Sequence, residues 1–161
     1  MNIDLLILCT VICGYGLWFS LAVLNNIADF QTNRFLIARM ISMQEILDDS
    51  NLGNGIQWRA LKGQHWSPII LTGVIFYQLL AASKLAIAGV ALISLVITGG
   101  ATTTELLFDI NIALLMMLAL WFGFLTGGLW FGYWIKMPQV QIVHIMLVLV
   151  TLICLILVNM L

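Results

Sequence analysis

Residues 110–134, INIALLMMLALWFGFLTGGLWFGYW, contain no aspartate, glutamate, lysine or arginine. A helix needs about 20 predominantly apolar residues to cross the hydrocarbon core of a bilayer. This stretch meets that requirement without a single charge, which predicts a transmembrane helix. Three other stretches have the same character, and Lys84 is the one charged residue inside them. The four predicted spans are residues 5–24, 69–97, 110–134 and 140–158.

The composition of the whole chain agrees with a polytopic membrane protein. Of its 161 residues, 63% are hydrophobic and 8% are charged, whereas soluble chains carry about 25% charged residues. The net charge of −1 disfavours a nucleic-acid-binding protein, which needs a basic surface. We therefore expect an all-α protein, a bundle of four transmembrane helices forming a single domain over residues 1–161.

The sequence contains no recognisable catalytic or metal-binding motif. It has no Ser/His/Asp set, HExxH pair, phosphate-binding loop or dinucleotide fingerprint. The spacing of Cys9, Cys13 and Cys154 does not match a zinc module or a disulfide framework. We therefore predict a protein that is not an enzyme and has no metal site.

The loop between the first two spans, residues 25–67, contains a predicted amphipathic helix over residues 33–48, NRFLIARMISMQEILD. At helical spacing, one apolar stripe runs along this segment, and Asn33 is a suitable N-cap. Such a helix can lie in the headgroup plane, or it can pack over the bundle. The stripe consists of Leu36, Met40, Met43 and Leu47.

The two ends of the predicted bundle carry different charges. Four spans place both termini at one end, the terminal side, and residues 25–67 at the other end, the loop side. By the positive-inside rule, an excess of basic residues marks the cytoplasmic end. The loop side is therefore predicted to be cytoplasmic and the termini periplasmic. The basic residues of the loop side are Arg34, Arg39, Arg59, Lys62 and Lys136.

Aromatic residues are distributed in the same one-sided way. Tryptophan favours membrane interfaces, because its ring is apolar and its N–H needs a partner. The pattern therefore predicts an aromatic belt at the loop side, or alternatively a docking surface there. The tryptophans placed toward that side are Trp18, Trp58, Trp66, Trp130 and Trp134.

Two GxxxG pairs occur in the third span, Gly123 with Gly127 and Gly128 with Gly132. Small residues let two membrane helices approach closely. The glycines are therefore predicted to be helix-packing residues, either inside the bundle or against another chain.

Lys84 interrupts the second span. An ionisable residue at membrane depth is costly and suggests a function. Its side chain can reach an interface by snorkelling, or it can pair with a carboxylate of the third helix, Glu105 or Asp109.

His65 and His144 are the two histidines of the chain, and both are predicted near the loop side. Two neutral imidazoles on facing helices can hold haem b in a membrane bundle. The alternative is an interfacial His65 and a hydrogen-bonded His144, with no cofactor.

Three short motifs carry a resemblance to a known family. They are Asn25-Asn26-Ile-Ala-Asp29-Phe-Gln-Thr-Asn33 in the first loop, Trp58-Arg59-Ala60, and Gly127-Gly128-Leu-Trp130-Phe131. The chain resembles domain-of-unknown-function family 2165, predicted small integral membrane proteins, over nearly its whole length. Leu129 stands where that family typically has an acidic residue. The resemblance implies a four-helix protein of the bacterial inner membrane and implies no activity.

The motif residues form a predicted interface with lipid or a partner. Asx side chains at the end of the first span can cap the next element, and arginines can pair with Asp29 or with lipid phosphates. The motif can thus fix the loop to the bundle or form a ligand site. The predicted interface comprises Asn25, Asn26, Asp29, Arg34, Arg39, Trp58, Arg59, Trp130 and Trp134.

Three functions follow from these observations. The first is an accessory or assembly subunit of a larger membrane complex, with membrane lipids and other subunits, or further copies of the chain, as partners. The second is a small transporter or lipid-handling protein in which Lys84, Gln78 and the Asn25, Asn26 and Asp29 cluster line a path. The third is a redox subunit holding haem between His65 and His144.

Overall fold

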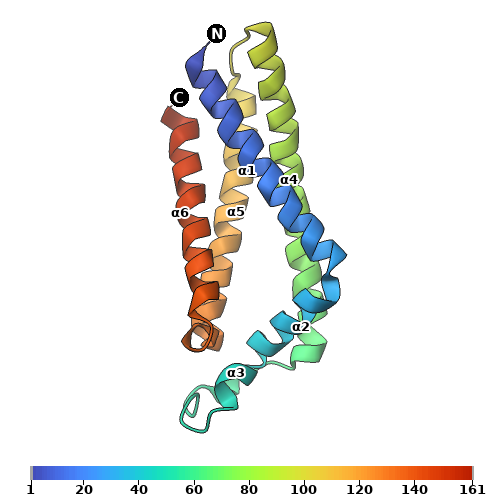
Figure 1. Cartoon of the computed structure of the whole chain (residues 1–161), viewed down its shortest axis with the longest axis vertical. Helices are drawn as coiled ribbons and strands as arrows, with labels where there is room; N and C mark the ends of the chain where they lie inside the picture. The colour runs from blue at the N-terminus through green and yellow to red at the C-terminus, as the bar shows by residue number, and fades with distance from the viewer. Residues whose placement is uncertain (1, 161) are drawn as a thin grey trace.

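Four long helices dominate the computed structural model, which describes residues 2–160 (Figure 1). They are α1 (Ile3–Ala28), α4 (Gly63–Thr98), α5 (Thr104–Phe131) and α6 (Pro138–Met160). Each is long and apolar enough to cross a membrane, which confirms the four predicted spans and the all-α class. The shorter elements are α2 (Phe30–Ile41), α3 (Gln44–Leu47), η1 (Gln57–Arg59) and η2 (Tyr133–Ile135).

The helices α4 and α5 begin before the apolar segments that predict them. Helix α4 starts at Gly63 rather than residue 69 and contains Pro68 near its start, where one helical hydrogen bond is lost. Helix α5 starts at Thr104, because Thr103 Oγ1 caps it by accepting a hydrogen bond from Leu106 N at 3.2 Å. Polar first turns therefore hide both starts from an analysis of hydropathy.

The end of α5 also differs from the prediction. The helix stops at Phe131, and Gly132 follows in the left-handed conformation with φ of +66°. Glycine adopts this conformation without a side-chain clash, which makes it a common helix terminator. Trp134 therefore lies in η2 and not in the third span.

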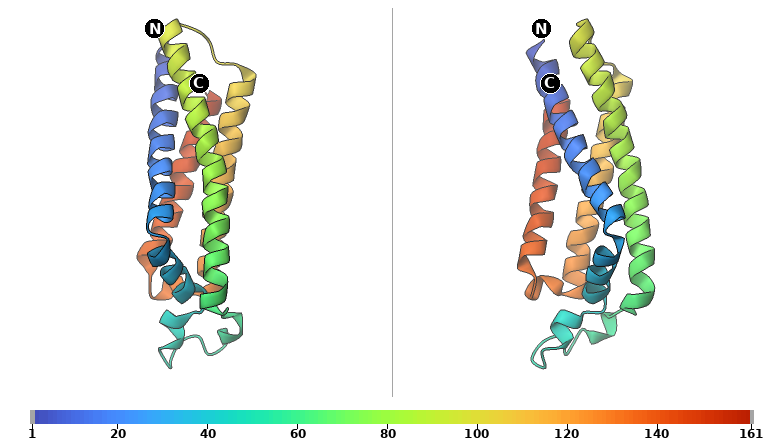
Figure 2. Two further views of the ribbon diagram at one scale, coloured as in Figure 1. Left: turned by 90° about the vertical axis from the view of Figure 1, so that its right-hand side faces the viewer. Right: turned by 45° about the vertical axis from the view of Figure 1, so that its right-hand side comes forward.

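The bundle consists of two helix pairs that are close together at the terminal side and separate toward the loop side. Helix α1 packs along α4, α5 packs along α6, and α4 also packs on α5. Helix α1 runs obliquely, so that its C-terminal end lies beside α4 and away from α6 (Figures 1 and 2). The fully buried side chains between the pairs include Ile12, Leu85, Leu114 and Met117.

One polar cluster ties three helices together in the middle of the bundle. The Thr151 hydroxyl donates to the Leu147 carbonyl at 2.7 Å and accepts from the Trp121 indole N–H at 3.1 Å. The Tyr15 hydroxyl is 2.6 Å from the same oxygen and donates to it, because the Thr151 proton is already used. A single hydroxyl thus connects α1 and α5 to α6.

The amphipathic segment forms two helices, and not the single predicted one. Helix α2 begins at Phe30 with Asp29 as its N-cap, whereas Asn33 instead bonds the Asp29 carbonyl through Nδ2 at 3.1 Å. Met43 has φ of +55° and separates α2 from α3. This break moves the apolar stripe, so that Ile46 is buried and Leu47 is exposed.

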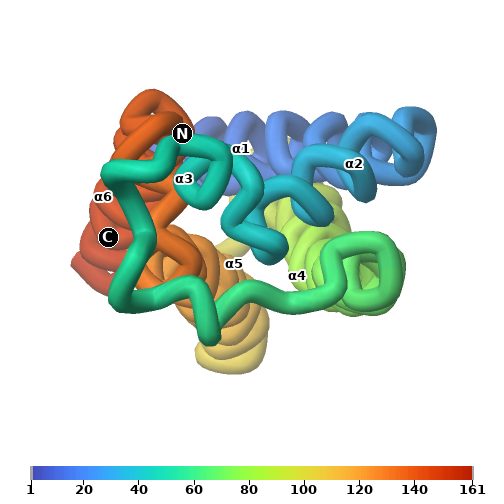
Figure 3. Tube along the Cα trace, turned by 90° about the horizontal axis from the view of Figure 1, so that it is seen from below, coloured from blue at the N-terminus to red at the C-terminus, as the bar shows by residue number. Residues whose placement is uncertain are grey.

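Helix α2 and the following loop lie across the loop-side end of the bundle (Figure 3). Helix α2 packs on α4, and any side chain at Gly63 would collide with the Ala38 carbonyl. Leu61 N donates to Ile41 O at 2.8 Å. The C-terminal end of α2 is therefore attached to the start of α4 and to the segment that precedes it.

Candidate functional site

A cavity of about 380 Å³ lies where the two helix pairs separate. Helices α2 and α4 form one wall, and α5 and α6 form the other, with Asn26 from the end of α1 between them. Most of the lining is apolar, as expected for a ligand site. The apolar lining includes Leu36, Met40, Ile70, Leu71, Val74, Phe131 and Val140.

Two glycines of α5 help to make this space. A Cβ atom built on Gly123 or Gly127 would meet nothing within 4 Å, and both residues line the cavity. The prediction that this pair packs against another helix inside the bundle is therefore wrong, because α1 and α4 diverge from α5 here.

The other glycine pair has two separate roles. Gly128 packs under the Gln141 side chain of α6, so it is a helix-packing residue. Gly132 terminates α5 with its positive φ, as described above, and so does not pack two helices together.

Two amide side chains that line the cavity are hydrogen-bonded to each other. Asn26 Nδ2 donates to Gln78 Oε1 at 2.8 Å, which joins the end of α1 to α4. Gln78 is only 3% exposed although it lies in an apolar span. A buried amide in apolar surroundings is costly unless it is hydrogen-bonded, so this pair fixes the position of both side chains.

His144 lines the opposite wall, beside aromatic residues. Its ring centroid lies 4.9 Å from that of Phe124, and its Nδ1 atom is enclosed and makes no hydrogen bond to any described residue. The Tyr133 hydroxyl donates to the Phe124 carbonyl at 3.0 Å. Burial raises the pKa of Tyr133, which keeps this hydroxyl neutral and able to donate.

The structure does not bring the two histidines to a common site. His144 lines the cavity, whereas His65 lies exposed in the first turn of α4, against the ring of Trp66 at 5.4 Å. The cavity therefore offers one imidazole where the predicted haem b site requires two. Within residues 2–160, no group of three or more metal-ligating side chains is present either.

An aromatic path leads from the packed core to the cavity. Phe19 and Trp121 meet edge to face at 5.8 Å, and Trp121 lies 5.8 Å from Phe124, next to His144. Phe19 and Trp121 are 1% and 4% exposed. Phe124 lines the cavity, and the rings of Trp121 and Phe19 continue from it into the packed core.

At the loop side, Arg59 is held between two tryptophans. Its guanidinium carbon lies 5.3 Å from the Trp58 ring and 4.9 Å from the Trp130 ring. Its Nη1 donates to the Trp130 carbonyl at 3.4 Å, a group at the end of α5 that lacks a helical partner. Cation–π contacts of this kind favour arginine. The Trp58-Arg59 and Trp130 motifs therefore form one cluster that fastens the loop to α5.

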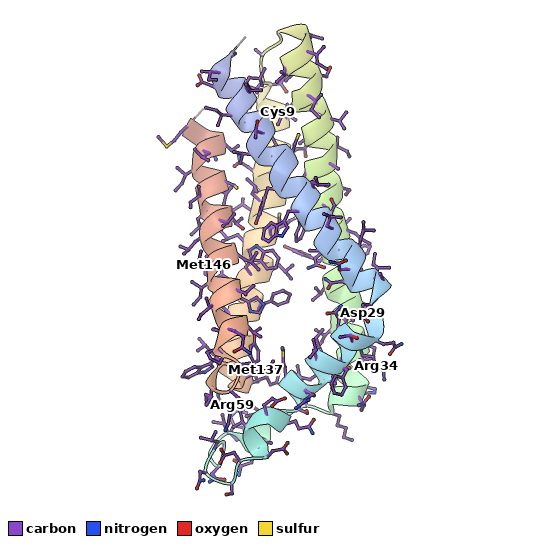
Figure 4. The ribbon with its side chains drawn as sticks, viewed as in Figure 1. Cys9, Asp29, Arg34, Arg59, Met137 and Met146 are labelled. Atoms are coloured by element: carbon purple, nitrogen blue, oxygen red, sulfur yellow. The ribbon has the colours of Figure 1, made fainter. Side chains whose placement is uncertain are left out.

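The predicted pairing of arginines with Asp29 is not found. Asp29 caps α2 by accepting from Thr32 N at 3.4 Å. Arg34 bonds Gln64 and Arg39 pairs with Glu45. Figure 4 shows Asp29 and Arg34 on one side of the loop-side end and Arg59 on the other. Asp29 and Arg34 belong to the N-terminal part of α2, whereas Arg59 packs on Trp130 at the end of α5, so the predicted interface is not one continuous surface.

Two predicted interface residues, Trp134 and Asn25, and two further tryptophans have simpler environments. Trp134 is exposed in η2 and Trp66 is exposed near the start of α4, as an aromatic belt requires. Asn25 is exposed, and its side chain makes no hydrogen bond to a described residue. Trp18 is exposed on α1, three residues beyond Tyr15 in the direction of the loop side.

Lys84 pairs with Asp109, one of its two expected partners. The Nζ to Oδ1 distance is 2.8 Å, and the pair joins α4 to α5. The two side chains remain 40% and 55% exposed, so the pair lies on the outer surface of the bundle and not in the cavity. Lys84 therefore does not line a path together with Gln78.

Sequence reasoning missed most of the cavity lining. The signal was present in Gln78, a polar residue within an apolar span, and in Gly123 and Gly127, which mark a helix face without side chains. Neither observation identifies the contribution of α2, which adds Ile37 and Met40 to the wall that it forms with α4.

Residues 4–161 match a family described as predicted small integral membrane proteins. The chain belongs to this family, DUF2165. The predicted resemblance is thereby confirmed over nearly the whole chain, and in this member of DUF2165 two of the three motifs meet at Arg59. No curated protein and no solved structure matches the chain.

Proposed function

We propose that this protein binds the apolar part of a membrane amphiphile in the cavity between its helix pairs. The observation that carries the proposal is the largely apolar cavity of about 380 Å³ within helices suited to a bilayer. Its volume falls in the range of known ligand sites, about 300–1,000 Å³. A lipid or isoprenoid chain in this space would make dispersion contacts with its apolar walls.

The proposal is a form of the lipid-handling function, without catalysis or haem. The motif search indicates no catalytic set, and the cavity offers His144 as its single imidazole. We further propose that the protein lies in the bacterial inner membrane with its loop side in the cytoplasm. The five basic residues of that side support this orientation.

Photolabelling tests the proposal. The purified protein in mild detergent would be irradiated with a phospholipid whose acyl chain carries a diazirine, and the labelled residues would be mapped by mass spectrometry. We expect labelling of cavity residues such as Val74 and Phe131. Gly127→Leu should reduce this labelling, because its side chain enters the cavity.

Gly14→Leu is the matched control, because Gly14 also has open space around it but lies exposed on α1. It should leave cavity labelling unchanged. Label confined to the outer faces of the helices, or equal labelling of cavity residues in Gly127→Leu, would contradict the proposal.

A second candidate function is that of a subunit in a larger membrane complex. The observation that favours it is the exposed Lys84–Asp109 pair. Charged groups facing lipid are costly, and a partner helix with polar groups would cover them. We expect a stoichiometric partner of the tagged protein to be lost when Lys84→Met and Asp109→Leu are combined, but kept in Ser83→Met. A partner retained by the double variant would contradict this assignment.

A further inference from the structure

We infer that the cavity binds an uncharged amphiphile whose polar end carries carbonyl oxygen atoms, and that Gln78 and His144 donate hydrogen bonds to that end. This inference rests on the proposed function and specifies the ligand class of the same site.

The charge of the lining excludes a phosphate or carboxylate headgroup inside the cavity. Among the described residues, no Asp, Glu, Lys or Arg lines it. None of the five basic residues of the loop side lines the cavity, and three of them are engaged elsewhere: Arg39 with Glu45, Arg59 with Trp130, and Lys136 with Asp49. An ionised group in an apolar site is strongly unfavourable without a paired charge. The bound end of the ligand must therefore be neutral.

Gln78 provides the first donor. The Asn26–Gln78 contact uses one NH2 group and one oxygen of the two amides. It leaves the Gln78 NH2 group without a hydrogen bond to any residue from 2 to 160, although the side chain is almost fully buried. If both amides are turned over, Asn26 carries the free NH2 group instead. In either arrangement the free NH2 group belongs to a residue that lines the cavity, where a ligand carbonyl can accept from it.

His144 provides the second donor, from the opposite wall. Its Nδ1 atom is enclosed and unpartnered, which leaves Nε2 as the ring nitrogen that a ligand in the cavity reaches. Neutral imidazole carries its proton on one nitrogen, and the inference assigns that proton to Nε2, which then donates to the ligand. The Phe124 ring holds the imidazole in place.

Donors on two walls, with apolar side chains around them, match a molecule with carbonyl groups and a hydrophobic tail. A glycerol ester and an isoprenoid quinone both have this chemistry. A simple alkane has the tail but no acceptor, and an alkyl phosphate has a charge that the cavity does not balance.

Competition against the diazirine-bearing phospholipid tests the inference with the full-length protein. The competitors would be monodecanoylglycerol, a decyl-substituted benzoquinone, decane and decyl phosphate, each compared at equal mole fraction in the detergent micelles. We expect the two carbonyl compounds to displace the label from cavity residues about fivefold more effectively than decane. Decyl phosphate should compete at least about tenfold more weakly than the carbonyl compounds.

Gln78→Met removes the first donor with little change in shape. In this variant the advantage of the carbonyl compounds over decane should fall by about fivefold, while decane competes as before. Gln141→Met is the matched control, because Gln141 lies on α6 outside the cavity and bonds the Leu125 carbonyl. It should preserve the advantage.

The outcomes distinguish the inferred ligand class from the proposed binding of an apolar chain. Competition by only one carbonyl compound supports the inference and identifies an ester or a quinone as the source. Equal competition by decyl phosphate, or an advantage that survives Gln78→Met, overturns the inference but leaves chain binding intact. Absence of cavity labelling by the phospholipid itself overturns the proposed function.

Discussion

In the middle of the bundle, one hydroxyl of Thr151 satisfies groups from three helices, whereas toward the loop side Gln78 and His144 keep unpaired nitrogen atoms beside a cavity. The first region is closely packed and the second is open, although both consist of the same apolar helices. The difference arises because α1 leaves α6 and follows α4. Packed regions contribute stability, and regions with unmet hydrogen bonds contribute binding.

The sharpest test of this contrast truncates an apolar side chain in each region. Leu114→Ala in the packed region should lower the free energy of unfolding by about 2–5 kcal/mol, because a cavity is left behind. Ile70→Ala, in the wall of the existing cavity, should cost less than about 1.5 kcal/mol. Reversible unfolding in mixed micelles measures both values. Equal losses would show that the two regions do not differ in packing.

The polar cluster gives the next largest effect. Thr151→Val removes the acceptor of Tyr15 and Trp121, and we expect a loss of about 1–2 kcal/mol in the same unfolding assay. Thr10→Val is its control, because Thr10 bonds only the Leu6 carbonyl of its own helix. A similar loss in both variants would refute the role assigned to the three-helix connection.

Two adjacent glycines sharpen the comparison further. Gly127→Ala should stabilise the protein by about 0.5–1 kcal/mol, because alanine is the better helix former and the space is open. Gly128→Ala should give no such gain, since its methyl group displaces Gln141. The difference between the two unfolding midpoints is the measurement, and a gain of equal size at both positions would count against the cavity.

The smallest effect concerns the loop-side ion pair. Lys136 Nζ lies 2.9 Å from Asp49 Oδ2, and the hydrogen bond to Lys136 is the main cause that lowers the pKa of Asp49 from its ordinary 3.8. A carboxylate with a lowered pKa stabilises the folded state above the ordinary value, and this contribution is lost as the pH falls through the lowered value. Unfolding midpoints of wild type and Asp49→Asn should therefore differ slightly at pH 6 and converge in strong acid.

Asp48→Asn is the control for this pair, because no described residue forms an ion pair with Asp48. The unfolding midpoints of wild type and Asp48→Asn should differ by the same amount at pH 6 and in strong acid. If the difference in unfolding midpoint between wild type and Asp49→Asn grew as the pH fell, it would contradict the stabilising role assigned to the Asp49 carboxylate.

The four helices were predictable because each contains an apolar stretch that is long enough by itself to specify a span. Their starts were not, since Gly63 and Thr104 open polar turns that only tertiary packing makes helical. The break at Met43 was also hidden, because methionine rarely adopts a positive φ and no local signal in the sequence marks this residue, which is buried in the structure.

Contacts between helices were predictable only where chemistry restricts the partners. Lys84 had two carboxylates within reach and pairs with one of them. The cavity had no such restriction, because Gly123 and Gly127 allow either close packing or open space. Which of these occurs depends on the oblique direction of α1, and this direction is a property of the whole bundle.

The saturation of Thr151 has a consequence for the hydration of the middle of the bundle. Its proton is given to Leu147, and its oxygen already accepts from two groups. It therefore has no hydrogen-bonding capacity left for a water molecule. The rings of Phe19 and Trp121 pack against each other beside it. The one polar cluster of the packed region is thus complete without water, whereas the cavity toward the loop side keeps polar groups that a ligand can satisfy.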